Sequence, residues 1–276
     1  MMTVELKFDH AVHFVDHPGQ IPAELAERGI HAVQGGRHEQ IGTYNALTYF
    51  DLSYIEWIGI FDRQLLPPHR DTEKYGLIET LYKDGYREGL SRIALRTGQI
   101  EELAARLAAK GLEVIGPVDC SRKRPDGKLL QWKLLFAGTP EEGLPLPFFI
   151  QWEESDEARR EDLVLSGTIQ EHSLGPVSLQ YVAFAVRDLE QTVRDWTDWL
   201  ALPAEAAVYD DYWKGKKQIL QAGEVSLAFI EPEEGGPAWH ALQDRGERPF
   251  ALGLNSGKNR EFRQVVQLHA ASYHLG

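Results

Sequence analysis

The stretch that decides the fold spans residues 35–61 and reads Gly-Gly-Arg-His-Glu-Gln-Ile-Gly-Thr-Tyr-Asn-Ala-Leu-Thr-Tyr-Phe-Asp-Leu-Ser-Tyr-Ile-Glu-Trp-Ile-Gly-Ile-Phe. Its Tyr, Ile, Trp, Phe and Thr residues favour a pleated, half-buried surface, so we predict a glycine-rich turn followed by two strands. The second strand places Glu56 among apolar and aromatic neighbours. A carboxylate in such a place must be solvated, hydrogen-bonded, paired or metal-bound, because burying a bare charge is costly. Glu56 is therefore the first candidate functional residue.

The composition indicates an ordinary globular protein and bears on its class of partner. The 276 residues are 43% hydrophobic and 26% charged, which allows one large domain or two of average size. The net charge of −13 disfavours nucleic acid and anionic membranes, although arginines that cluster locally could still hold a small anion. The single cysteine, Cys120, excludes an internal disulfide. The N-terminus has no apolar run of signal-peptide length, and no segment has the length of a membrane helix, so the expected location is the cytoplasm.

A β-α-β-β-β order begins the chain and then recurs. In the first unit, a strand at residues 6–15 precedes an amphipathic helix at 21–28, a strand near 30–33 and the two strands of the opening stretch. Further first strands are predicted at residues 89–96, 177–186 and 248–254, and the last of these leads into a predicted closing helix at 260–273. Repetition of one supersecondary unit indicates that the units pair with one another to bury their apolar faces.

The repeat predicts two domains. Residues 1–155 contain two full units, residues 156–175 form a polar linker, and residues 176–276 contain one full unit with a truncated βα unit. Alignment of the first strands places His10, Arg92 and Tyr181 at equivalent positions.

These features resemble the vicinal oxygen chelate superfamily. His10 lies on the first strand and Glu56 on the fourth, and the segments Gly-Gly-Arg-His, Tyr-Ile-Glu-Trp and 121–127 are similar to those of its glyoxalase-like domain proteins. The resemblance implies an α+β fold in which paired βαβββ units form a curved, eight-stranded sheet around a cavity. Members of the superfamily include lyases, isomerases, dioxygenases and resistance proteins that only bind small molecules, so the fold does not choose a reaction.

The resemblance also implies a set of site positions, one on the first and one on the fourth strand of each unit. The first unit supplies His10 and Glu56, both suited to a divalent metal such as Zn, Ni, Mn, Co or Fe. The second unit supplies Arg92 and Gln151, and the sequence departs from the pattern there, because arginine stays protonated and cannot ligate a metal. His13 falls on the opposite face of its strand from His10 and is expected to pack toward a helix.

Two interpretations of this site stay open, and we favour the second. In one, a third ligand such as His38 joins His10 and Glu56, and a metal is bound. In the other, Arg92 faces Glu56, pairs with it where the metal would lie, and orients a substrate carboxylate.

Other polar residues are candidates for contact with a ligand. Asn45 shares a strand face with Thr43, and the two glycines allow the backbone beside Arg37 and His38 to approach a ligand closely. The predicted hairpin at residues 121–127 offers a clamp for anions, with an aromatic wall beside it. The substrate-binding candidates are Arg92, Asn45, Gln151, Arg37, His38, Arg122, Arg124 and Trp132.

We therefore expect a lyase, isomerase or related enzyme that acts on a small carbonyl- or carboxylate-bearing metabolite. Glu56 would be the general base or a ligand, and His10 the partner acid or second ligand. The alternative is a protein of the resistance type that sequesters a small molecule without chemistry. A third option is that the first domain is scaffold and the second carries the function. A monomer and a homodimer are both compatible with the sequence.

Overall fold

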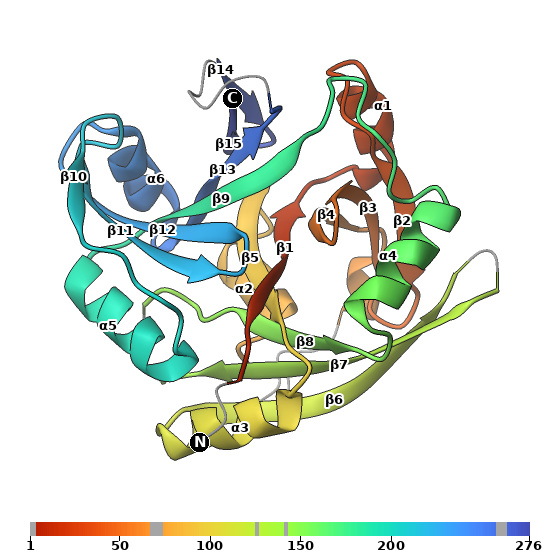
Figure 1. Cartoon of the computed structure of the whole chain (residues 1–276), viewed down its shortest axis with the longest axis horizontal. Helices are drawn as coiled ribbons and strands as arrows, with labels where there is room; N and C mark the ends of the chain where they lie inside the picture. Colours follow the sequence, from red (N-terminus) through yellow and green to blue (C-terminus); the bar gives the residue numbers. More distant parts are fainter. Residues whose placement is uncertain (1–3, 67–73, 125–126, 141–142, 258–263) are drawn as a thin grey trace.

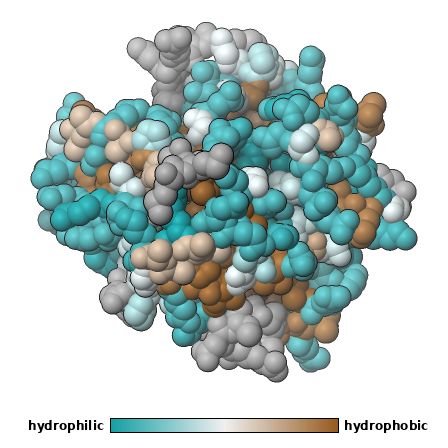
Figure 2. All heavy atoms as spheres, turned by 60° about the horizontal axis from the view of Figure 1, so that its bottom comes forward, coloured by the Kyte–Doolittle hydropathy of each residue, from teal (hydrophilic) through white to brown (hydrophobic). Residues whose placement is uncertain are grey.

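The fold consists of two curved β-sheets packed beside one another (Figure 1). The computed structural model describes residues 4–66, 74–124, 127–140, 143–257 and 264–276. Within these ranges, no helix is both long and apolar enough to cross a membrane. The face in Figure 2 is mainly hydrophilic, with smaller hydrophobic areas between the polar residues.

The first sheet contains eight strands in the spatial order β2-β3-β4-β1-β5-β8-β7-β6. β4 is parallel to β1, β8 is parallel to β5, and β1 and β5 join the two units as an antiparallel pair. The predicted α+β fold with two paired units in one eight-stranded sheet is confirmed. The strands are β1 (Lys7–Phe14), β2 (Val33–His38), β3 (Thr43–Phe50), β4 (Ser53–Ile60), β5 (Gly89–Arg96), β6 (Glu113–Lys123), β7 (Leu129–Gly138) and β8 (Phe148–Trp152).

The second sheet contains seven strands in the order β10-β11-β12-β9-β13-β15-β14. It repeats the arrangement of the first, with β12 parallel to β9, β15 parallel to β13, and β9 antiparallel to β13. The strands are β9 (Ser178–Ala185), β10 (Val208–Asp210), β11 (Gly215–Ala222), β12 (Val225–Pro232), β13 (Arg248–Asn255), β14 (Gln264–Leu268) and β15 (Ala271–Leu275).

Six α-helices and two 3₁₀ turns lie in the described residues. The helix of each full unit crosses over the outer face of its sheet, and Leu103 and Leu107 show why α3 forms there, since both are buried at i, i+4 spacing. The helices are α1 (Ile21–Ala26), α2 (Leu77–Lys83), α3 (Ile100–Ala109), α4 (Asp156–Leu165), α5 (Leu189–Leu200) and α6 (Pro237–Arg245), and the turns are η1 (Pro18–Gln20) and η2 (Arg63–Leu65).

Two local predictions are wrong. Gly35 and Gly36 lie within strand β2, at an irregularity in its pairing with β3, and the chain turns after His38 instead. The predicted closing helix is strand β14 and strand β15 over its described part, while residues 260–263 lie outside the described residues. His269 and Ala270 both have positive φ and join these strands in a tight hairpin turn, which the sequence does not signal because neither is glycine or asparagine.

The predicted polar linker also contains a helix, α4, and the sequence prediction missed α2 and α6 as well. The division into two domains stays a prediction, but the two sheets share one cluster of buried apolar residues. β13 packs against β5 at this junction. Ion pairs also join the two regions. The buried Asp84 carboxylate, which follows α2, pairs with Arg245 of α6 and with Arg248 of β13, whose Nη1 lies 2.6 Å from Asp84 Oδ1.

His13 links the two sheets from the outer face of β1. Its imidazole is completely buried, and its Nε2–H donates to the His269 carbonyl oxygen at 2.9 Å, which leaves Nδ1 to accept from the Tyr273 hydroxyl at 2.6 Å. The expectation that His13 packs toward a helix is wrong, because the β14–β15 hairpin covers it. Burial lowers the pKa of His13 to about 3, so the ring is neutral.

This neutral histidine predicts a loss of stability in mild acid. Because the pKa of His13 is lower in the folded chain than in the unfolded chain, its contribution is complete above about pH 6.5 and falls as pH drops toward 3. Between about pH 7.5 and pH 5, the free energy of unfolding of the wild type should fall by roughly 2 kcal/mol more than that of His13→Gln. Urea unfolding at both pH values measures this, with the exposed His17→Gln as a control that keeps the wild-type dependence. Equal pH dependence in His13→Gln and wild type would contradict the assignment.

Candidate functional site

The candidate site lies on the inner face of the first sheet, where β1 and β4 are neighbours. The His10 Nε2 atom is 3.6 Å from the Glu56 Oε2 atom. On its other side, His10 Nδ1–H donates to the Asp9 carboxylate at 2.7 Å. Two adjacent residues contact one another in this way because the pairing of β1 with β5 shifts between Phe8 and His10, and this bulge interrupts the alternation of side chains.

Asn45 on β3 holds the second oxygen of Glu56. Its Nδ2–H donates to Glu56 Oε1 at 2.6 Å, and its own Oδ1 accepts from the Gly36 backbone N–H at 2.7 Å. A Cβ atom at Gly35 would lie 1.9 Å from Asn45 Oδ1, so the absence of a side chain there is what allows Asn45 to reach Glu56. The amide thus fixes the carboxylate in one orientation.

Aromatic rings enclose the pair. Tyr54 stacks on His10 with ring centres 4.5 Å apart, Tyr49 stacks on Tyr54 at 4.6 Å, and Phe148 meets the His10 ring edge-on at 5.3 Å. Burial raises the pKa of both tyrosines, so their hydroxyls are neutral. The Glu56 side chain keeps 14% of its surface exposed and is the accessible member of the group.

The Arg122 side chain brings the two edge strands of the first sheet into contact near this site. β6 and β2 are the two edge strands, yet a Cβ atom at Gly36 would lie 1.4 Å from Arg122 Nη1. The guanidinium of one edge strand therefore crosses the glycine backbone of the other, and the sheet is curled into a half-barrel. His38 donates to or accepts from the Thr43 hydroxyl at 2.9 Å, and burial lowers its pKa, opposed by the charge of Glu56 and reinforced by that of Arg122.

The buried Asp9 carboxylate also contacts β8 and α4. Trp152 Nε1–H donates to its second oxygen at 3.0 Å, and Arg159 lies 3.8 Å from the same atom. Burial acts to raise the pKa of Asp9, but the hydrogen bond from His10 and the charge of Arg159 outweigh it, so the pKa lies below its usual value. Asp9 is therefore charged and fixes His10 with Nε2 facing Glu56.

A family model described as the glyoxalase-like domain matches residues 8–200, which is more than half of the chain. The chain belongs to this glyoxalase-like family of the vicinal oxygen chelate superfamily. No curated protein matches the sequence.

Solved structures show the same fold at low sequence identity. A hypothetical protein from Staphylococcus aureus has a TM-score of 0.78 at 22% identity, covering 98% of this chain and 99% of that one. A variant of 4-hydroxymandelate synthase from Streptomyces coelicolor has a TM-score of 0.54 at 14% identity, covering 92% of this chain and 71% of that one. At these identities the likeness shows the fold alone.

In this glyoxalase-like fold, the second unit does not supply the contacts that the sequence predicts. Arg92 is buried but does not pair with Glu56: its guanidinium donates to the Tyr75 and Leu146 carbonyl oxygens and, at 3.0 Å, to the Thr80 hydroxyl. The reason is α2, which the sequence prediction missed and which packs on the inner face of the second unit. Burial lowers the pKa of Arg92 to about 10, so it is charged at neutral pH.

The predicted register of β8 is also wrong. The Gln151 side chain accepts from the Ile100 backbone N–H at 2.9 Å, so it caps α3 on the outer face. Val12 pairs with Glu56 across β1 and β4, and Ala94 pairs with Phe148 in the same way across β5 and β8. Phe148 therefore occupies the position equivalent to Glu56, and an odd shift in register moves Gln151 to the other face.

The remaining candidates are dispersed. Arg37 lies outside the site, with its guanidinium 3.7 Å from the Phe61 ring centre and paired with Glu39. Arg124 pairs with Asp162 of α4 at 2.6 Å. Trp132 lines the inner face beside Trp152, with ring centres 5.7 Å apart. Residues 125–126 of the predicted hairpin turn lie outside the described residues.

The donor set does not fit a conventional metal centre of the superfamily. His10 Nε2 and the Glu56 carboxylate are suitable ligands, but arginine and phenylalanine occupy the other two positions. In the described part of the chain, no group of three or more His, Cys, Asp or Glu side chains is arranged to hold a metal ion.

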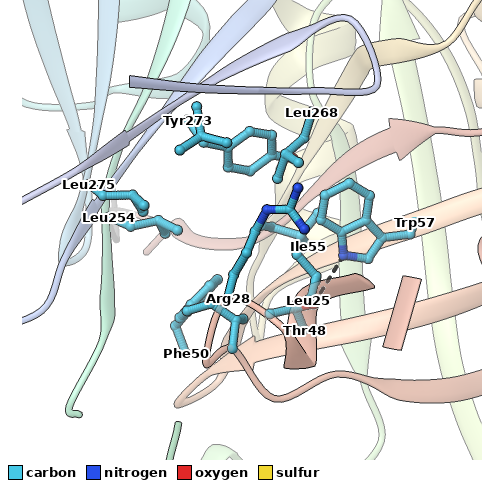
Figure 3. A pocket seen from close by; sticks show the side chains of 12 residues that line it. Leu25, Arg28, Thr48, Phe50, Ile55, Trp57, Leu254, Leu268, Tyr273 and Leu275 are labelled. Atoms are coloured by element: carbon cyan, nitrogen blue, oxygen red, sulfur yellow. Dashed lines mark hydrogen bonds between the residues drawn. The ribbon is translucent and has the colours of Figure 1, made fainter. Parts of the chain in front are cut away.

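A separate apolar pocket lies between the sheets, on the outer face of the first (Figure 3). Thr48 and Trp57, which line it, alternate with the site residues along β3 and β4 and are hydrogen-bonded to one another. Its cation, Arg28, donates to the Glu24 carbonyl oxygen at 2.8 Å. This pocket does not reach Glu56.

The contact between Gly35 and Asn45 predicts a substitution that perturbs the site. In Gly35→Ala, the new methyl group collides with Asn45 Oδ1, which must leave Glu56 or force β2 away. We expect a loss of about 1–3 kcal/mol in the free energy of unfolding, typical of overpacking. Urea unfolding measures it against Gly19→Ala, where a methyl group meets no atom within 4 Å. Equal stability of the two variants would show that Asn45 is not held as described.

Proposed function

We propose that this protein is an enzyme that moves a proton at a carbon beside a carbonyl group of a small carbonyl- or carboxylate-bearing metabolite. The observation that carries the proposal is the arrangement of His10 and Glu56, whose facing atoms are 3.6 Å apart, with Asn45 holding the other carboxylate oxygen. A fixed carboxylate and a fixed imidazole on one wall of an aromatic enclosure are the groups that general acid–base catalysis requires.

The residues take distinct roles in this proposal. Glu56 removes the proton from the carbon, and the electron pair of that C–H bond moves toward the carbonyl oxygen. His10, when protonated, gives the proton on Nε2 to that oxygen, and Asp9 stabilises the imidazolium through Nδ1. Arg122 lies close enough to influence the charge state of His38 and offers a positive charge to an anionic substrate at the edge of the site.

The alternative proposal is a binding protein that sequesters a small molecule. The inner face of the second unit favours it, because α2 and Arg92 fill the space that a complete superfamily site would use. In that case the aromatic enclosure of Tyr49, Tyr54 and Phe148 would determine affinity, and the His10–Glu56 pair would only add polar contacts.

Replacement of Glu56 by glutamine separates these two functions. Glu56→Gln keeps the shape of the side chain and its contact with Asn45 but removes the base, so turnover should fall by at least about a hundredfold while ligand affinity changes only a few-fold. Exchange of C–H protons for deuterium in a panel of small 2-hydroxy and 2-oxo compounds, followed by proton NMR, measures turnover. The exposed Glu190→Gln on α5 serves as the control. An absence of exchange with every compound in the wild type would favour the binding protein.

Metal content tests the interpretation in which His10 and Glu56 are ligands of a bound metal. With two suitable ligands, we expect purified protein to contain far less than one equivalent of Zn, Ni, Mn, Co or Fe by elemental analysis. A near-stoichiometric metal that is lost in both His10→Ala and Glu56→Ala would contradict this expectation and assign these two residues as ligands instead.

A further inference from the structure

Arg159 on α4 is buried in a helix whose other side chains are mostly polar and solvent-facing. Only 4% of the residue is exposed. Its guanidinium carbon lies 4.1 Å from the centre of the Trp152 ring, on the inner face of the first sheet. The helix that connects the two sheets therefore inserts a positive charge beside the candidate site.

The Arg159 guanidinium lies near two carboxylates but makes no hydrogen bond to either. The nearest carboxylate oxygens belong to Asp9, at 3.8 Å, and Asp156, at 3.9 Å, and both distances exceed hydrogen-bond reach. His10 and Trp152 already donate to Asp9, while Arg96 donates to Asp156. Within the described ranges, no atom accepts a hydrogen bond from this guanidinium, and its Nη1 is fully buried without a partner.

The charge of Arg159 reaches the aromatic stack above His10. Burial raises the pKa of Tyr49 and of Tyr54, and the charge of Arg159 acts in the opposite direction on both, as the charge of Arg122 does on Tyr49. The charges of two guanidinium groups, one from α4 and one from β6, thus act on the ring stack that covers His10.

We propose that Arg159 forms a subsite for a carboxylate group of the ligand that binds beside His10 and Glu56. A buried guanidinium without acceptors is costly, and a planar carboxylate satisfies two of its donors at once. The inference rests on the proposed function only in that a small molecule occupies this face. It adds the requirement that this molecule is an anion, with its carboxylate beside Trp152 and its reacting carbon nearer Glu56.

Pyruvate and its uncharged methyl ester test the subsite without any catalytic step. The Trp152 indole N–H donates to Asp9 next to Arg159, so its signal in proton–nitrogen NMR spectra reports binding at this position. In the wild type, pyruvate should bind at least about tenfold more tightly than methyl pyruvate. In Arg159→Met, which keeps the bulk on Trp152 without the charge, the two affinities should become equal.

The matched control is the next residue of the same helix. Arg160 is paired with Asp51 on the surface, so Arg160→Met should keep the wild-type preference for pyruvate. The two proposals are tested separately. If the protein catalyses no exchange, the preference for pyruvate can still be measured, and if Arg159 binds no carboxylate, exchange that depends on Glu56 can still be measured.

Three results would overturn the proposal: no preference for pyruvate in the wild type, an undiminished preference in folded Arg159→Met, or loss of preference in Arg160→Met to the same extent. If thermal unfolding shows that Arg159→Met does not fold, Arg159→Lys decides. Lysine keeps the charge but not the two parallel donors, so pyruvate affinity should fall several-fold, and an unchanged affinity would reject the subsite.

Discussion

The carboxylate of Asp9 is the group around which this part of the molecule is arranged. It is completely buried at a bulge of β1, and a buried charge requires hydrogen bonds and opposite charge from its surroundings. His10 comes from the same strand, Trp152 from β8 and Arg159 from α4. Satisfying one carboxylate thus brings together both units of the first sheet and the segment that leads to the second. The same contact turns the free nitrogen of His10 toward Glu56.

The repeated units show how one backbone position serves different purposes. Tyr181 pairs with Gly253 in the second sheet as His10 pairs with Ala94 in the first. Because Gly253 has no side chain, the Tyr181 ring lies across its strand and the hydroxyl meets His274 Nδ1 at 2.7 Å. The backbone order is retained in both sheets, whereas the paired carboxylate and imidazole occur in the first.

Much of the fold could be predicted because it depends on local patterns. The strand and helix periods identified the βαβββ order, and alternation along β4 placed Glu56 on the inner face opposite Trp57. The family resemblance predicted that His10 and Glu56 share a site, and the structure places them on the adjacent parallel strands β1 and β4. The hairpin turn at residues 269–270 could not be predicted, because neither residue is glycine and their positive φ values are imposed by the pairing of β14 with β15.

The sequence by itself determined the order of the strands in the first three units and the first helix of each, and the family resemblance identified the two strands that carry the imidazole and the carboxylate. It did not determine α2, α4, α6 or the closing hairpin. Tertiary structure alone decided which groups meet the imidazole and the carboxylate. The bulge brought Asp9 into contact with His10, α2 drew Arg92 away from Glu56, and α4 supplied Arg159 from a stretch without apolar periodicity. The physical reason is that the alternation of side chains along a strand determines which sheet face a residue lies on only where no bulge interrupts the strand. Partners distant in the chain are chosen by the burial and hydrogen bonding of charged groups, which no local pattern records.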